Sequence, residues 1–277
     1  MEFKIAMIED GFSPETYRAY NLDLRELGAD LLRLHFETHQ YEARIYGAVR
    51  TTSEFMSMRW LRGSGMEVGA GGHPTKLFGN ATAMMNDCDP DLVFGGEKLD
   101  FKASVDDEKF SYGIEKRFDF TIASHVLEHA DSFLRAIKNL IDVTKKGGFI
   151  YLVLPDIEFI HDNPWMPRFD IEHHIAEFSN PLKHADLHDT AYINGTSNGI
   201  GIDENAHATL SKTYTEAVIA GKIPSELRFV HHKHNYSFED WTKLFFECKN
   251  FLSYSFNIVD IRYGYERMDC HYILRVA

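Results

Sequence analysis

Residues 118–156 constrain the fold more than any other part of the sequence, because they read as one strand, helix and strand unit. An apolar run covers 118–123, and apolar residues then recur at helical spacing through 133–141. A second apolar run at 149–154 lacks alternation, which is typical of a strand covered by helices on both faces. We expect Lys145 and Lys146 in the last helical turn, and Gly147 and Gly148 to end the helix.

Polar residues follow both strands of this unit. The motif S-H-x-L-E-H begins at Ser124, directly after the first strand, and Asp156 follows the second. Open α/β sheets bind ligands beyond the carboxyl ends of their strands, so we expect a site near Ser124, His125 and Asp156. His129 is expected to pack behind this loop, and Glu128 to anchor the turn by accepting backbone N–H bonds.

Composition narrows the classes of partner. Asp and Glu outnumber Lys and Arg by 42 to 29, which gives a formal net charge of −13, without an evident basic stripe. Nucleic acid and anionic membrane surfaces are therefore disfavoured as partners. The cysteines Cys88, Cys248 and Cys270 are isolated, which suits a reducing compartment. The N-terminus is unlike a signal peptide and no apolar run nears the ~20 residues that span a bilayer, so we expect a cytoplasmic protein.

The pattern of elements predicts four regions. They are an N-terminal helical cap at 1–64, a cofactor-binding core at 65–156, an inserted acceptor or lid region at 157–236, and a closing helix with two strands at 237–277. In the core, strands are expected at 66–68, at 81–85 and around 98–103. Ser237 is expected to be the N-cap of the closing helix, and the last two strands to form an antiparallel pair at one edge of the sheet.

A glycine-rich turn follows the first core strand. Glu67 lies at the strand end, and Gly69, Gly71 and Gly72 lie in the turn, where missing side chains let a ligand approach the backbone. A nicotinamide fingerprint, G-x-G-x-x-G, needs a glycine at the sixth position, but Pro74 stands there. An acid before the loop suits an amino group or a cationic ligand and repels a pyrophosphate.

Two acids end the second core strand. Asp87 lies twenty residues after Glu67, and Asp89 follows two residues later. Either carboxylate is placed to accept two hydrogen bonds from a ribose diol, as acids at this position do in nucleotide-binding α/β folds. The structural alternative is an Asx turn that leaves the strand before Pro90.

These features together resemble the class I S-adenosylmethionine-dependent methyltransferases over about residues 66–156. Within that family the chain is most similar to bacterial enzymes found with glycan or secondary-metabolite genes, in which an H-x-H segment precedes a later helix as it does at 232–234. The resemblance implies a Rossmann-like, seven-stranded, mostly parallel sheet with an antiparallel edge strand. It also implies S-adenosyl-L-methionine as the cofactor and S-adenosyl-L-homocysteine as its product. His73 departs from the family, because it replaces the usual third glycine.

The resemblance assigns cofactor contacts to the strand ends. The glycine loop lies under the methionine part, an acid holds the ribose, a Ser-His pair lies beside the sulfonium, and one or more of the residues at 100–107 contact the adenine. The cofactor-binding residues expected on this basis are Glu67, Gly69, Ala70, Gly71, Asp87, Asp89, Phe101, Asp107, Ser124 and His125, with Asp100 and Asp106 as alternatives for the adenine contact.

Histidines crowd the predicted insertion, with nine of the fifteen between 156 and 236. Methyl transfer mainly requires alignment of acceptor, methyl group and sulfur, and a hydroxyl acceptor gains further from a general base. We take His161, Asp162, His173 and His174 as the catalytic candidates. The E-H-H and H-x-H groups offer metal ligands, but no pair has the H-E-x-x-H or a comparable spacing, and we expect no metal.

The sequence therefore predicts a methyltransferase that acts on a small polar acceptor, with a sugar or nucleotide-sugar hydroxyl as the leading candidate. One alternative is N-methylation of a small amine or amide. Another is a catalytically silent cofactor-binding partner protein, because the glycine loop and the acids bind cofactor without doing chemistry. A nicotinamide oxidoreductase is disfavoured by Pro74 and by the lack of a Tyr-Lys proton relay. A homodimer is compatible with the sequence, which does not fix the oligomeric state.

Overall fold

The computed structural model describes residues 27–38, 51–71, 74–87, 99–114, 117–157, 168–180, 188, 232–264 and 269–277. Seven strands in these residues form one sheet in the order β3-β2-β1-β4-β5-β7-β6. The strands are β1 Ser64–Val68, β2 Thr82–Asp87, β3 Phe101–Lys102, β4 Phe118–Ser124, β5 Thr144–Pro155, β6 Phe256–Gly264 and β7 Asp269–Val276.

The sheet has the mixed character that the sequence predicts. Strands β1 to β5 pair in parallel, and β7 pairs antiparallel with both β5 and β6. The fold class is confirmed, and the last two strands form the predicted antiparallel pair at one edge. Within that pair β6 is outermost, so the strand that runs against the others, β7, lies one place in from the edge. The strand order reverses between β1 and β4, and this is the position where open α/β sheets bind ligands.

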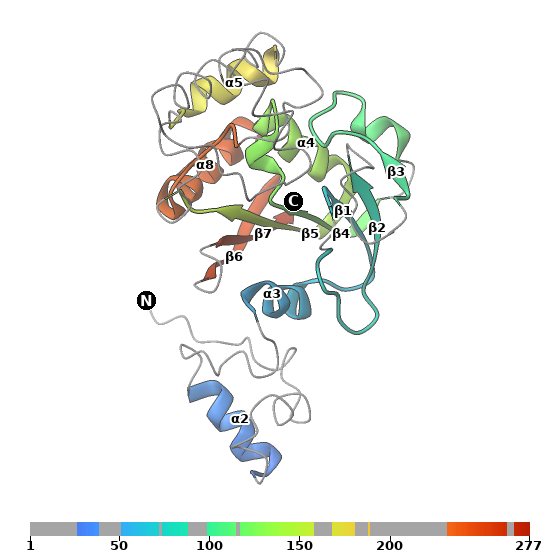
Figure 1. The fold of residues 1–277 in the computed structure, drawn as a ribbon, viewed down its shortest axis with the longest axis vertical. Helices are drawn as coiled ribbons and strands as arrows, with labels where there is room; N and C mark the ends of the chain where they lie inside the picture. Colours follow the sequence, from blue (N-terminus) through green and yellow to red (C-terminus); the bar gives the residue numbers. More distant parts are fainter. Residues whose placement is uncertain are drawn as a thin grey trace, which may run out of the picture.

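Helices cover both faces of the sheet. Figure 1 shows α4 and α8 on one face, with α5 beyond them, and α3 on the other face. The helical elements are α2 Ala29–Thr38, α3 Thr52–Trp60, α4 Phe133–Val143, α5 Ile171–Ser179, α8 Phe238–Phe251, and the short 3-10 helices η4 Phe110–Gly113 and η5 Leu127–His129.

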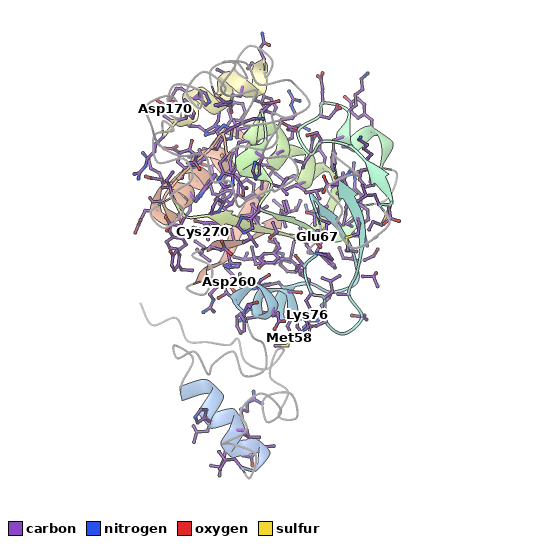
Figure 2. The ribbon with its side chains drawn as sticks, viewed as in Figure 1. Met58, Glu67, Lys76, Asp170, Asp260 and Cys270 are labelled. Carbon is purple, nitrogen blue, oxygen red and sulfur yellow. The ribbon has the colours of Figure 1, made fainter. Side chains whose placement is uncertain are left out.

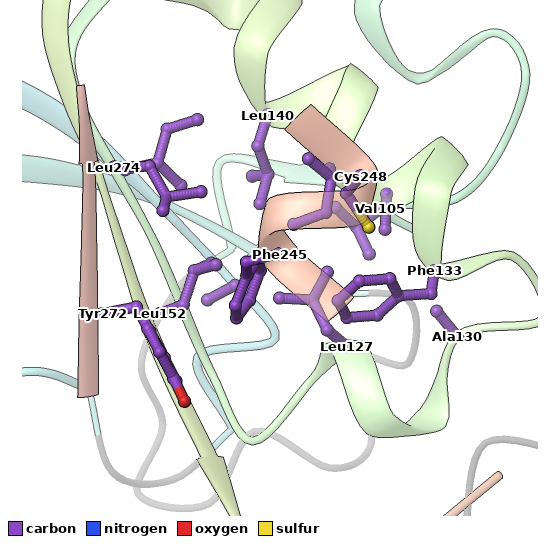
Figure 3. Close-up of a cluster of buried hydrophobic side chains, with 14 of the residues drawn as sticks. Val105, Leu127, Ala130, Phe133, Leu140, Leu152, Phe245, Cys248, Tyr272 and Leu274 are labelled. Carbon is purple, nitrogen blue, oxygen red and sulfur yellow. The ribbon is translucent and has the colours of Figure 1, made fainter. Parts of the chain in front are cut away.

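Two buried cores result from this layering. In the larger core, Leu152 and Leu274 of the sheet face Leu140 of α4 and Phe245 of α8 (Figure 3). The smaller core lies on the other face, where Met56 and other residues around α3 pack against β4 and β5. Because β5 is buried on both faces, residues 149–154 need no alternation of apolar and polar side chains.

Helix α4 ends earlier than the sequence predicts. Its last residue is Val143, and β5 begins at Thr144, so the two lysines and two glycines shape the start of a strand and do not cap the helix. The Lys145 ammonium lies 2.6 Å from the Asp119 carboxylate of β4, and Gly147 has a φ of +78°. Thr144 pairs with Phe118 of β4, which ends the helix at Val143, and the β-branched side chain of Thr144 suits the extended backbone.

The closing helix begins where the sequence predicts. The Ser237 hydroxyl accepts a hydrogen bond from the Asp240 N–H at 3.3 Å and so caps α8. One turn later, the Trp241 indole N–H donates to the Pro155 carbonyl at 2.8 Å. The Ile157 N–H donates to the Tyr236 carbonyl at 3.1 Å. The entry to α8 is therefore attached to the exit of β5.

The division into four regions stays a prediction. Helices α2 and α3 fall in the region predicted to be helical, and β3 falls in the interval predicted for the third strand. Much of the predicted insertion lies outside the described residues. Among the described helices, none has both the length and the apolar character required to cross a bilayer.

Candidate active site

The turn after β1 adopts a conformation that favours glycine. Gly69 and Gly71 have φ values of +61° and +53°, in the left-handed region that costs other residues energy. A Cβ atom on Gly69 would lie 2.3 Å from Cγ2 of Val126, which belongs to the loop after β4. The loops that follow β1 and β4 thus meet at the position where the strand order reverses.

The Glu67 carboxylate fixes this turn by binding Thr75, which follows it in the chain. The carboxylate is buried and accepts hydrogen bonds from the Thr75 N–H, at 3.0 Å to each oxygen, and from the Thr75 hydroxyl at 2.8 Å. Figure 2 labels Glu67 within the sheet. The acid therefore supports the glycine loop by binding the chain beyond it, and its predicted contact with a ligand stays a prediction.

Asp87 ties the turn to the neighbouring strand. The Gly71 N–H donates to Oδ2 of Asp87 at 3.1 Å, and the Ala70 N–H donates to the Asn86 carbonyl at 3.4 Å. Asp87 is almost fully buried at the end of β2. The structure thus brings together Glu67, the predicted loop residues and Asp87, whereas Asp89 lies outside the described residues.

Several side chains of residues 100–107, the segment expected to contact adenine, make contacts within the protein. Phe101 pairs with Asn86 at the start of β3, and its ring lies 6.0 Å from that of Phe110. The Asp107 carboxylate accepts a hydrogen bond from the Lys109 N–H at 2.7 Å. Asp106 accepts from the Asp131 N–H at 2.6 Å and from the Ser132 N–H at 3.2 Å, just before α4. Phe101 thus lies beside the end of β2, next to Asp87.

His125 lies at the carboxyl end of β4, next to Ser124, with two carboxyl groups beside it. Its Nδ1 lies 3.4 Å from Glu128, and its Nε2 lies 3.4 Å from Asp269 at the start of β7. Its backbone is also left-handed, with a φ of +55°. Burial alone would lower the pKa of His125, but Asp269 and Glu128 outweigh it and raise the pKa from 6.5 to about 10. The imidazole is therefore a cation near neutral pH.

Glu128 anchors the S-H-x-L-E-H turn, but through its backbone and not its carboxylate as predicted. Its carbonyl accepts hydrogen bonds from the N–H groups of Lys233 at 2.7 Å and His234 at 3.1 Å. The carboxylate is fully buried, and its oxygens have no hydrogen-bond partner among the described residues. Burial would raise the pKa of Glu128, yet His125, His129 and His232 outweigh it and lower the pKa to about 2. His129 itself packs against His232, with ring centroids 4.6 Å apart.

The catalytic candidates in α5 belong to a separate buried cluster. His173 and His174 both bind Glu177, with Nε2 of His173 at 2.7 Å and Nδ1 of His174 at 3.0 Å from its oxygens. His188 and His234 each place Nε2 at 3.0 Å from Oε1 of Glu177. Both ring nitrogens of His174 have partners, because its Nε2 lies 2.7 Å from the Tyr236 hydroxyl. This arrangement favours a structural role for His173 and His174.

Burial and charge set the protonation of this cluster. Burial lowers the pKa of His188, and it lowers the pKa of His234 to about 3, although Glu177 opposes both shifts. Burial would raise the pKa of Glu177, but His234, His173, His174 and His188 outweigh it and hold that pKa far below its usual range. The Glu177 carboxylate is therefore ionised, and the His188 and His234 imidazoles beside it are neutral.

Some of the predicted site residues lie outside the described residues. Two residues that the structure places in these clusters were not predicted from the sequence. His161 and Asp162 lie outside the described residues, as does His73 in the glycine loop. The sequence reasoning missed Glu177 and Asp269. For Glu177 a signal existed, because His173 and Glu177 are four residues apart and so share one helix face. For Asp269, which reaches His125 only through the pairing of β5 with β7, we find no such signal.

Comparisons with known proteins return only distant matches. No family model and no curated protein matches the sequence. Among solved structures, a SAM-dependent methyltransferase from Thermotoga maritima, a possible histamine N-methyltransferase, is 14% identical over 93% of this chain and 98% of its own, with a TM-score of 0.39. A putative S-adenosylmethionine-dependent methyltransferase from Listeria monocytogenes is 11% identical over 78% and 91%, with a TM-score of 0.40.

A third match is PKMT2 from Rickettsia typhi, solved in complex with AdoHcy. It is 11% identical over 76% of this chain and 48% of its own, with a TM-score of 0.38. All three TM-scores lie below 0.5, so the sheet order seen directly in this structure supports the fold class better than these similarities do.

Proposed function

We propose that this protein is an S-adenosyl-L-methionine-dependent methyltransferase that acts on a small polar acceptor. The observation that carries the proposal is the closed glycine turn between β1 and β2, held by Glu67 and Asp87 at the position where the strand order reverses. A ligand there meets exposed backbone on one side and the loop after β4 on the other.

The charges of the site favour a cationic cofactor. Glu67, Asp87, Glu128, Asp156 and Asp269 are all buried at or near the strand ends. Carboxyl groups in a partly desolvated site attract a sulfonium and an amino group, and they repel a pyrophosphate. The residues present therefore fit S-adenosyl-L-methionine better than they fit a nicotinamide dinucleotide.

The residues around the cofactor mainly position and shield. When bound, S-adenosyl-L-methionine supplies an electrophilic methyl group, and the protein aligns the acceptor with it and excludes water. Asp87 would hold the ribose through its carboxylate at the end of β2. His125 is protonated between its two carboxyl groups, so it orients the loop after β4 and does not act as a base. For a hydroxyl acceptor, the base candidates that follow β5 are His161 and Asp162.

The proposed class of acceptor rests on the resemblance to the methyltransferase family. A sugar or nucleotide-sugar hydroxyl leads, with a small amine or amide as the alternative. A catalytically silent protein that binds the same cofactor is the competing candidate, because it would use the same loop and acids.

Calorimetric titration tests the cofactor. S-adenosyl-L-homocysteine should bind at about micromolar Kd, and NAD⁺ should not bind at the same concentrations. Gly69→Ala should abolish binding, because the new Cβ meets Val126. Gly79→Ala is the matched control: Gly79 also has a positive φ, +64°, but a Cβ there meets no atom within 4 Å. Binding of NAD⁺ by the wild type, or equal loss in both variants, would overturn the cofactor assignment.

Mass spectrometry tests the reaction. The protein is incubated with S-adenosyl-L-methionine and pools of nucleotide sugars, free sugars and small amines, and products heavier by one methylene are sought. Methylated sugars support the leading acceptor, and methylated amines replace it. Tight cofactor binding without any product would favour the silent partner protein.

A further inference from the structure

Four potential metal ligands converge on one point between α5 and the segment that enters α8. The ligand atoms are Nε2 of His173, His188 and His234 and one carboxylate oxygen of Glu177, all within 4.8 Å of one another. Oε1 of Glu177 lies 2.7 Å from His173 and 3.0 Å from both His188 and His234. The Nε2 atoms of His173 and His188 are 3.0 Å apart.

Hydrogen bonds alone satisfy this arrangement poorly. One carboxylate oxygen faces three imidazole nitrogens, and two of those nitrogens also face each other. A neutral imidazole carries a single N–H, so His173 and His188 cannot both donate to Glu177 and also form a good bond with each other. The Nδ1 atoms of His188 and His234 are buried without a hydrogen-bond partner among the described residues, so both rings depend on Nε2 for polar contact.

The spacing fits a small cation at the centre. Ligands about 2.0–2.1 Å from a tetrahedral Zn²⁺ lie about 3.3 Å from one another. The separations from Glu177 to the three imidazoles, and from His173 to His188, are 2.7–3.0 Å, a few tenths of an ångström shorter.

A second layer of residues orients the ligands. His174 Nδ1 lies 3.0 Å from Oε2 of Glu177, which turns Oε1 toward the three imidazoles. His174 is fixed in turn by Tyr236, whose hydroxyl donates to the Phe169 carbonyl at 2.9 Å. The Phe169 ring stacks on His173 with centroids 3.7 Å apart. Metal sites in proteins use such outer contacts to fix ring orientation and exclude water.

We propose that His173, Glu177, His188 and His234 form a closed, four-coordinate site for a divalent transition-metal ion, with Zn²⁺ as the expected occupant. Four protein ligands leave no open position, so the ion is structural and not catalytic. It would join α5 and residue 188 to the segment that leads into α8, and so attach the predicted acceptor region to the core. The inference does not depend on the proposed methyl transfer.

The site is shielded but reachable. The His173 side chain is 10% exposed, whereas those of Glu177, His188 and His234 are fully buried. An ion would therefore enter past His173. Figure 2 labels Asp170, the N-cap of α5, on the side of the molecule that carries this cluster, separate in that view from Glu67 in the sheet.

Elemental analysis of the wild-type protein is the first test. Protein purified without chelator from zinc-supplemented medium should contain about one Zn²⁺ per chain. X-ray absorption at the zinc edge should show about four N or O neighbours at 2.0–2.1 Å and no sulfur. Stoichiometric content of another transition ion with these ligands also supports the site and changes only the occupant. Metal below about one tenth per chain, with no rise in melting temperature on adding Zn²⁺, Fe²⁺, Co²⁺ or Ni²⁺, would overturn it.

A matched pair of variants assigns the ligands. Glu177→Gln should reduce metal content at least tenfold, whereas Glu172→Gln, an exposed position on the same helix, should keep wild-type content. If Glu177→Gln fails to fold, reversible chelation of the wild type replaces it: removal should lower the melting temperature, and Zn²⁺ should restore it. Equal metal content in both variants, or no thermal response to chelation, contradicts the assignment.

Discussion

The backbone carbonyl of Glu128 accepts a hydrogen bond of 3.1 Å from the N–H of His234. This contact links the proposed cofactor site to the proposed metal site. The Glu128 side chain faces His125 at the end of β4, while His234 contributes an imidazole to the buried cluster around Glu177. The S-H-x-L-E-H turn therefore lies between the proposed cofactor site and the proposed metal site, and it contacts both.

The Glu67→Gln variant should lose both stability and cofactor affinity. Glu67 accepts three hydrogen bonds from Thr75, and an amide can replace only part of this pattern because its NH₂ group faces a donor. Bonds to a buried charged group contribute about 1.5–3 kcal/mol, so we expect a loss of about 2 kcal/mol in the free energy of unfolding. Affinity for S-adenosyl-L-homocysteine should fall about tenfold as the loop loosens. Urea denaturation and calorimetry measure the two effects.

Thr75→Val provides a graded comparison for this loop. It removes only the hydroxyl bond of 2.8 Å and keeps the backbone N–H, so its loss should be smaller, about 1 kcal/mol. If Glu67→Gln were as stable as wild type and bound the cofactor product equally well, Glu67 would not hold the loop.

His125 should make stability fall at alkaline pH. Its pKa is raised from 6.5 to about 10 by the neighbouring Asp269 and Glu128, against the effect of burial. A group whose pKa is raised in the folded state contributes stability that is fully present below its unfolded pKa. That contribution is lost as pH rises through the folded pKa. The wild type should therefore become less stable between pH of about 6.5 and 10.

Comparison with His125→Gln isolates this contribution. Other groups also titrate in the alkaline range, so the informative quantity is the difference in melting temperature between wild type and variant at each pH. That difference should be largest near pH 6.5 and shrink toward pH 10. A difference that stays constant over this range would show that the charge of His125 does not stabilise the fold.

Strands that are buried on both faces were predictable from the sequence, because each appears as a continuous run of apolar residues. Residues 118–123 and 149–154 were assigned correctly for that reason. The end of α4 is different, because Gly147 and Gly148 predict a stop several residues after the helix ends. In the structure Thr144 pairs with Phe118, and the ladder is irregular before Phe120. Strand pairing thus ends the helix at Val143, and the sequence alone does not reveal that pairing.

In the candidate site, too, some residues were predictable from the sequence and others were not. Glu67, Gly69, Gly71 and Asp87 lie close to the strand ends in the sequence, so their proximity follows from parallel pairing. The cluster around Glu177 is different, because its ligands come from one helix, from residue 188 and from the segment before α8. A search for short metal motifs cannot find such a set. The local signals were the spacing of His173 and Glu177 on one helix face and the E-H-H and H-x-H groups, which contain His173 and His234.

Trp241→Phe should weaken the attachment of α8 to the sheet. The fully buried indole donates to the Pro155 carbonyl at 2.8 Å, and phenylalanine would leave that carbonyl unpaired and some volume unfilled. We expect a loss of about 2–3 kcal/mol in the free energy of unfolding. Phe246→Leu, at an exposed position on the same helix, should change it by less than about 0.5 kcal/mol. Equal effects in denaturant titrations would contradict the role of the indole.

Loss of the metal should weaken cofactor binding, because the two sites share the turn at Glu128. Without the ion, Nε2 of His234 keeps only its contact with Glu177, and the hydrogen bonds from Lys233 and His234 to the Glu128 carbonyl should loosen. The carboxylate of the same residue lies beside His125, in the loop after β4 whose Val126 meets the glycine turn at Gly69. Coupling between sites typically changes affinity fivefold or more, so the Kd for S-adenosyl-L-homocysteine should rise at least about fivefold on chelation.

Thermodynamic linkage supplies the control for this coupling. If metal strengthens cofactor binding by a given factor, saturating S-adenosyl-L-homocysteine must strengthen metal binding by the same factor. Calorimetry on chelated and reloaded protein gives the first factor, and competition with a chromophoric chelator gives the second. Glu177→Gln should reproduce the weak binding of the chelated state, and Glu172→Gln should not. Equal cofactor affinity in chelated and loaded protein would mean that the turn at Glu128 keeps its geometry without the ion.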